Sequence, residues 1–150
     1  MKAPILSLCL ACIVLGSCSK KTSETAQPLT KSKLQLLTLA PWKETTLEYE
    51  NQDGTWTPKP LSADLQSYSN VFYDNGTYTV YTNSHTIIAN GTWVIIGDDT
   101  QLALNLNITY DFSILNETTM QLTLNAQIPY TDPSTNLTYN YFGMRETYVH

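Results

Sequence analysis

Apolar and polar residues alternate along most of the chain from Trp42 onward, in short runs separated by turn-forming residues. Every second residue from Leu102 to Leu106 is a leucine, and Leu122 and Leu124 repeat the pattern. A period of two places successive side chains on opposite faces of a β-strand. The pattern therefore predicts a sheet with one apolar face and one polar face.

Turn-forming residues divide this pattern into eight or nine strands. Asn-Gly pairs at 75–76 and 90–91 predict tight hairpins, because both residue types accept positive φ angles. The runs at 97–99 and 116–118 predict further turns. We expect strands at 42–50, 71–73, 77–82, 87–89, 92–96, 101–106, 108–115, 120–128 and 137–148, with 55–57 as an extension of the first strand into a hairpin.

Strands that follow one another through adjacent hairpins form an up-and-down meander. Such a sheet has two exposed edges, and closure into a barrel removes them. We therefore predict an all-β fold, an antiparallel up-and-down β-barrel of about eight strands. Apolar residues at helical spacing over 34–39, followed by Pro41, predict one short helix turn that packs on an end of the barrel.

The first 17 residues differ from the rest of the chain. Lys2 is followed by an apolar stretch over 4–15, by Gly16 and Ser17, and then by Cys18. This pattern is typical of a bacterial lipoprotein signal peptide, and the apolar stretch is shorter than the ~20 residues that a membrane-spanning helix needs. We expect residues 1–17 to be removed, Cys18 to carry palmitate or related acyl chains, residues 18–33 to form a flexible tether, and residues 34–150 to form the domain.

A lipid on Cys18 predicts a location in the cell envelope, attached to the outer membrane. Some lipoproteins of the Bacteroides group carry acidic residues after this cysteine as a surface-export signal. Here Ser19, Lys20 and Lys21 follow instead, so we expect the domain to face the periplasm.

Composition narrows the classes of partner and chemistry. The net charge of −5 argues against nucleic acid as a partner, because nucleic-acid-binding proteins carry clustered basic residues. Membrane attachment is therefore expected through the lipid and not through a basic surface. Without the signal peptide and the lipidated Cys18, no cysteine is left for a disulfide, a thiolate metal site or a nucleophile.

No group of residues predicts catalysis. His85 is expected in a loop, and Asp98 and Asp99 follow Gly97 at a position where turn geometry alone favours aspartate. The chain has no Gly-x-Ser-x-Gly motif and no phosphate-binding glycine loop. We expect a protein that is not an enzyme and that uses no cofactor or metal.

Several motifs, taken in order, resemble those of lipocalin-like lipoproteins of the Bacteroidetes type. They are the lead-in at 34–42, Phe72-Tyr73-Asp74-Asn75-Gly76-Thr77-Tyr78, Asn90-Gly91-Thr92-Trp93 with Asp98-Asp99, the two leucine strands, and Met144-Arg145-Glu146-Thr147-Tyr148. The resemblance covers 34–150 and implies a lipocalin-like barrel.

Lipocalins open their first strand with Gly-x-Trp, and an arginine of the last strand packs on that tryptophan. Ala40-Pro41-Trp42 and Arg145 correspond to these residues, although alanine replaces the glycine. The resemblance therefore implies that Arg145 covers Trp42 at the closed end of the barrel, a contact worth roughly 0.5–2 kcal/mol.

Aromatic residues on the predicted strands leave two functions open. An eight-stranded barrel has room for a filled core or for one small ligand, and bulky inward side chains favour the filled core. The protein is expected either to bind a small hydrophobic ligand or to act as a solid module that contacts another protein of the envelope. A pocket of roughly 300 Å³ or more favours the first function. The candidate ligand-binding residues are Tyr73, Tyr78, Trp93, Tyr110 and Phe112.

Overall fold

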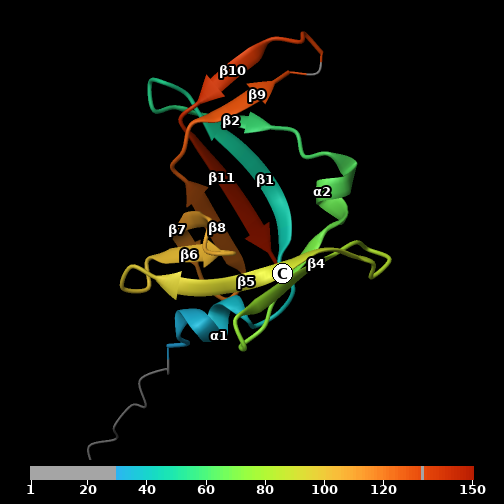
Figure 1. Cartoon of the computed structure of the whole chain (residues 1–150), viewed down its shortest axis with the longest axis vertical. Helices are drawn as coiled ribbons and strands as arrows, with labels where there is room; N and C mark the ends of the chain where they lie inside the picture. Colours follow the sequence, from blue (N-terminus) through green and yellow to red (C-terminus); the bar gives the residue numbers. More distant parts are fainter. Residues whose placement is uncertain (1–29, 133) are drawn as a thin grey trace, which may run out of the picture.

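A computed structural model describes residues 30–132 and 134–150 of the chain (Figure 1). Within these residues nine strands form one antiparallel sheet, in the order β2-β1-β11-β8-β7-β6-β5-β4-β3, and β9 and β10 form a separate hairpin. The mostly antiparallel β fold predicted from the sequence is confirmed. The predicted signal peptide, the lipidation of Cys18 and most of the predicted tether lie outside the described residues.

The elements are short, and most strands have four to eight residues. In chain order they are α1 (Lys33–Leu37), β1 (Lys43–Glu50), β2 (Trp56–Lys59), α2 (Ala63–Ser67), β3 (Ser69–Phe72), β4 (Thr77–Tyr81), β5 (Ile87–Ile96), β6 (Gln101–Leu104), β7 (Ile108–Leu115), β8 (Thr119–Leu124), β9 (Ile128–Thr131), β10 (Thr138–Tyr141) and β11 (Gly143–Val149).

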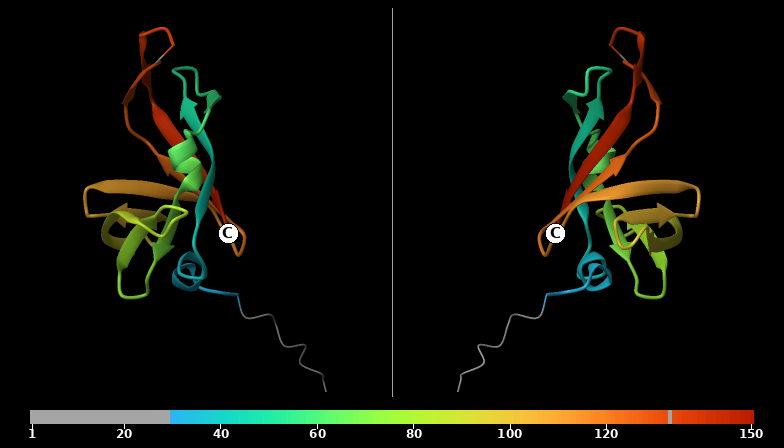
Figure 2. Two further views of the ribbon diagram at one scale, coloured as in Figure 1. Left: turned by 90° about the vertical axis from the view of Figure 1, so that its right-hand side faces the viewer. Right: turned by 90° about the vertical axis from the view of Figure 1, so that its left-hand side faces the viewer.

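The large sheet is strongly curved. β4 and β5 cross in front of β1 and β11 in Figure 1, and the side views of Figure 2 show the two sets of strands as separate layers. Trp42, directly before β1, forms an isolated antiparallel bridge with Asn70 of β3, with both N···O distances at 2.8 Å. The edge strand β3 therefore contacts the start of β1, while the segment that contains α2 joins the two edge strands β2 and β3.

The core lies on the concave side of the sheet. Cross-strand pairs such as Leu102 with Tyr110 and Met120 with Tyr148 place their side chains on this face. Leu37, Trp42, Leu102 and Met120 are fully buried there. The apolar positions that alternate along β6 and β8 in the sequence, such as Leu102 and Leu122, therefore lie on the buried face of the sheet.

The predicted helix turn is present as α1, which lies at one end of the molecule (Figure 1). Ser32 caps its first turn, and the Gln35 side chain accepts a hydrogen bond from the Ser32 backbone N–H in return. Leu37 is buried, and its carbonyl accepts a hydrogen bond from the indole Nε1 of Trp42 at 2.8 Å. This contact attaches α1 to the start of β1.

One predicted hairpin is wrong. β5 runs without interruption from Ile87 to Ile96, through Asn90 and Gly91. The glycine is needed there for space, because a Cβ at this position would lie 2.1 Å from Oδ1 of Asn105 and 2.8 Å from the Tyr78 ring. The chain turns earlier instead, at His85, where φ is 60°.

Other boundaries also differ from the prediction. β6 ends at Leu104, and positive φ angles at Asn105 and Leu106 turn the chain, so that Leu106 is 81% exposed instead of pointing into the core. β9 occupies part of the predicted loop after 128, and the predicted last strand is divided into β10 and β11. The helix α2 has no counterpart in the sequence prediction.

Candidate functional site

The concave face of the sheet contains a pocket of about 270 Å³. Seven strands, β3 to β8 and β11, contribute to its wall. Most of the lining is apolar, and the polar side chains in it are Asn70, Tyr78, Tyr110, Glu146 and Tyr148. An apolar pocket with a few convergent polar groups is typical of a small-molecule site.

Glu146 is the only acidic residue in this lining. One of its carboxylate oxygens, Oε2, accepts a hydrogen bond of 2.9 Å from the hydroxyl of Tyr148. Burial raises the pKa of Glu146, and the hydrogen bond from Tyr148 opposes this shift without cancelling it. Burial also raises the pKa of Tyr148 far above its ordinary value, so its hydroxyl stays protonated and remains a donor.

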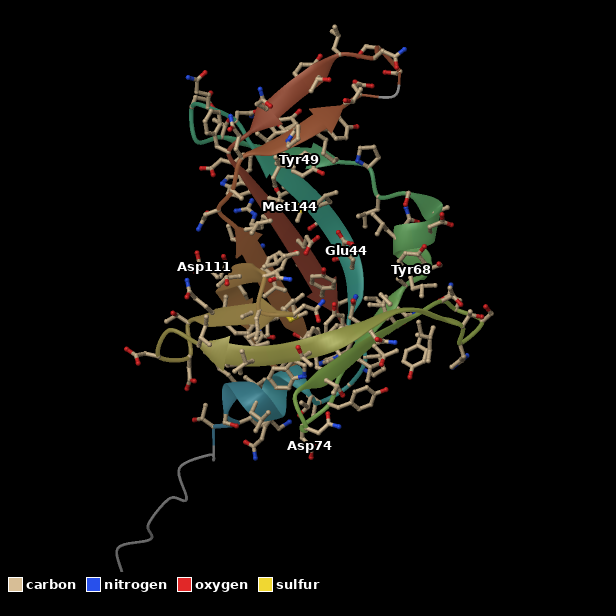
Figure 3. The ribbon with its side chains drawn as sticks, in the orientation of Figure 1. Glu44, Tyr49, Tyr68, Asp74, Asp111 and Met144 are labelled. Atoms are coloured by element: carbon tan, nitrogen blue, oxygen red, sulfur yellow. The ribbon has the colours of Figure 1, made fainter. Side chains whose placement is uncertain are left out.

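Glu44 provides a second carboxylate on the same face. It pairs with Tyr148 across β1 and β11, and directly opposed residues of two strands project to the same side. Figure 3 shows its side chain directed from β1 into the space enclosed by the sheet. Among the described residues, its Oε1 atom is buried and has no hydrogen-bond partner.

The two carboxylates repel one another, which changes the protonation of Glu44. Its pKa is raised from 4.5 to about 7, mainly by burial and secondly by the charge of Glu146. No lysine, arginine or histidine belongs to the lining around Glu146, and Lys59 is the only basic residue in the neighbouring hollow lined by Glu44. Neither carboxylate forms an ion pair within the described part of the chain. The site therefore combines an apolar wall with uncompensated acidic groups.

The alternation of β11 explains why Glu146 faces inward. Met144, Glu146 and Tyr148 lie on the concave face, whereas Arg145 and Thr147 lie on the convex face. The register with β1 agrees with this assignment, because Glu146 pairs with the apolar residue Leu47, and directly opposed residues project to the same face.

The predicted contact between Arg145 and Trp42 is wrong. Arg145 forms an ion pair of 2.8 Å with Glu48 on the convex face and stacks on Trp56, with 4.4 Å from its guanidinium carbon to the ring centroid. The register is the reason, because Lys43 pairs with Val149 and Trp42 therefore lies beside His150, far along the strand from Arg145. The Trp42 and His150 ring centroids are 3.7 Å apart.

The structure brings two of the five candidate ligand residues into the pocket, Tyr78 and Tyr110. Trp93 packs edge-on against Phe72 in the core, and its Nε1 donates a hydrogen bond to the Thr77 carbonyl at 2.8 Å. The other two candidates, Tyr73 and Phe112, do not belong to the pocket lining.

Tyr73 is exposed, and its hydroxyl lies 3.0 Å from that of Tyr81. Phe112 packs against the core beneath the amino group of Lys33.

Sequence reasoning missed Asn70, Glu44, Glu146 and Tyr148. The signal for Glu146 was present, because a glutamate occupies the apolar phase of a strand between Met144 and Tyr148. The signal for Glu44 was weaker, since β1 contains a bulge between Glu44 and Thr46 that shifts its alternation.

A second polar cluster lies at the base of the β9–β10 hairpin. The Lys59 amino group donates a hydrogen bond of 2.7 Å to the Tyr141 hydroxyl, and it lies 4.7 Å from the Tyr130 ring centroid. Tyr49 stacks on Tyr141 with 4.8 Å between ring centroids. Lys59 already contacts both the Tyr130 and the Tyr141 rings. We therefore infer that this cluster holds the β9–β10 hairpin against the large sheet.

The other residues considered for chemistry from the sequence lie in turns. His85, Asp98 and Asp99 all have positive φ angles and occupy turns, as the sequence predicted. Residues 30–132 and 134–150 contain no group of three or more histidine, cysteine, aspartate or glutamate side chains able to hold a metal ion. None of the helices in this part of the chain has the length and apolar character needed to cross a membrane.

Comparison with known proteins does not assign the chain to a family. No protein-family model matches the sequence, and no curated protein matches it.

Proposed function

We propose that this protein is a non-enzymatic lipoprotein of the cell envelope that binds a small, largely apolar molecule on the concave face of its sheet. The observation that carries this proposal is the pocket of about 270 Å³ with its apolar wall. Phe72, Leu104, Ile108, Met120 and Leu122 all contribute to that wall. At about 270 Å³ its volume lies just below the roughly 300 Å³ expected of a small-molecule site, so the ligand is small.

In this proposal the curved sheet is a lipocalin-like β-barrel. The two hydrogen bonds between Trp42 and Asn70 support closure, since they join the edge strand β3 to the start of β1. Closure protects a sheet edge and leaves the concave face as an interior that is accessible only from an end. The chain is attached to the outer membrane through a lipid on Cys18 and faces the periplasm.

A module that contacts another protein is the second candidate function. The adjacent residues Ile87 and Ile88 at the start of β5 favour it, because they are 55% and 44% exposed. Interaction surfaces commonly expose large apolar side chains of this kind. Contact with another protein needs no open pocket. Filling the pocket should therefore abolish ligand binding and leave a protein contact unchanged.

The test is to fill the pocket from its own wall. Ala89 belongs to the lining, whereas its neighbour Asn90 points to the opposite face of β5. We expect Ala89→Phe to weaken binding of 2-phenylethanol, measured by protein NMR titration, and Asn90→Phe to leave that binding unchanged. Equal binding by both variants, or no binding by the parent protein, would contradict a ligand site on the concave face.

A further inference from the structure

We propose that the ligand is an organic cation, whose protonated nitrogen binds between Glu44 and Glu146 while its apolar part fills the pocket. This inference rests on the proposed function, because it assigns the chemical class of the ligand to the same site.

The position of the two carboxylates is the first argument. Glu44 lies opposite Tyr148 in the register of β1 and β11, and Glu146 is two residues from Tyr148 on the same face. The pair is therefore diagonal across neighbouring strands, a separation within reach of long side chains. Glu146 belongs to the pocket lining, whereas Glu44 lines a neighbouring hollow along β1 and β2, close enough for the charge of Glu146 to act on it.

The unused hydrogen-bonding capacity is the second argument. An ionised carboxylate has about four acceptor positions. Within the described residues Glu146 uses one of them, for the Tyr148 hydroxyl, and Oε1 of Glu44 is buried without any partner. Most buried polar atoms in folded proteins are hydrogen-bonded, so this oxygen calls for a donor that the described chain does not supply.

Charge selects the class of donor. The lining carries no basic side chain, so an anionic ligand would be repelled and a neutral donor would leave the carboxylates uncompensated. An ammonium or amidinium group supplies both charge and hydrogen bonds. The rings of Tyr78, Tyr110 and Tyr148 line the same space, and aromatic faces attract organic cations.

A metal ion fits the site less well than an organic cation. Calcium takes six to eight oxygen ligands and magnesium six. The described residues provide two carboxylates here and no group of three acidic or histidine side chains. The apolar wall, moreover, has no role in holding a bare ion.

The test compares three molecules of nearly equal shape: phenethylamine, 2-phenylethanol and phenylacetate. Binding of each to the full chain is followed by NMR titration near pH 7.5. We expect the amine to bind at least about tenfold more tightly than the alcohol, and the acid not to bind. Addition of calcium chloride is expected to leave the affinity for the amine unchanged at constant ionic strength.

Variants locate the effect at the carboxylates. Glu146→Gln is expected to weaken amine binding about tenfold while binding of the alcohol stays the same, and Glu44→Gln provides the same readout if the first variant does not fold. Glu117→Gln is the matched control, because Glu117 is exposed and pairs with Lys31 away from the pocket. Circular dichroism checks the fold of each variant.

The outcomes separate the inference from the proposed function. Equal affinities for amine and alcohol would overturn the inference and leave the ligand pocket intact. Displacement of the amine by calcium would also overturn it, in favour of a metal site. Failure of all three molecules to bind would overturn both.

Discussion

The stability of this protein is expected to increase as the solution becomes mildly acidic, because of Glu44. Its pKa is raised from 4.5 to about 7, first by burial and second by the charge of Glu146. A carboxyl group with a higher pKa in the folded state binds more protons folded than unfolded. Its contribution to stability is therefore complete below pH 4.5 and is lost as the pH rises through about 7.

The magnitude follows from the shift. One pKa unit corresponds to about 1.4 kcal/mol, so the whole shift would correspond to about 3 kcal/mol. Glu44 remains partly exposed and solvent screens its charge, which reduces the expected effect to about 1–2 kcal/mol. For a chain of this length that corresponds to roughly 2–8 °C in the melting temperature. Burial of Glu146 raises its pKa as well, which adds to the change in the same direction.

The assay is urea denaturation of the parent protein and of Glu44→Gln at intervals from pH 4.5 to 8. Glutamine has a similar size and no charge, so the free energy of unfolding of the variant is expected to change less over this interval. Glu117→Gln, on the exposed turn, is expected to follow the parent curve. Asp53 and Asp132 have lowered pKa values and titrate below the interval. Parallel curves for the parent and Glu44→Gln would refute the reasoning.

Three further predictions concern the fold and its anchor. Leu37→Ala is expected to lower the free energy of unfolding by about 2–4 kcal/mol, measured by urea denaturation, because Leu37, the last residue of α1, is fully buried. A change below about 1 kcal/mol would show that α1 is not part of the core. Gly91→Ala is expected to lower the melting temperature, since the added methyl group would meet the Asn105 side chain at 2.1 Å, and an unchanged melting temperature would contradict this close approach. Cys18→Ala is expected to move the protein from the membrane fraction to the soluble fraction on cell fractionation, and retention in the membrane would contradict the lipid anchor.

Local patterns predicted those elements that local chemistry determines. β7 was predicted with its observed limits, and Asn75-Gly76 forms the expected turn, in which Oδ1 of Asn75 accepts the Thr77 N–H. The same dipeptide at 90–91 lies inside β5, because Asn105 and Tyr78 approach Gly91 from other strands. Glycine can serve a turn or a close contact, and only the tertiary fold distinguishes the two.

Long-range pairing accounts for what the sequence did not predict about the site. Arg145 was expected at Trp42, but the register of β1 with β11 places it beside Glu48. Glu44 and Glu146 are about a hundred positions apart in the chain and meet only because the first and last long strands pair. Tyr78 and Tyr110 were predictable as candidates from their aromatic character, whereas the carboxylates beside them depend on that pairing.

The most direct test of a ligand-binding concave face is native mass spectrometry of the protein purified from the organism that produces it. We predict a bound small molecule in the parent protein and in Asn90→Phe, and its loss in Ala89→Phe. The bare mass in all three samples, with the fold intact, would contradict the account.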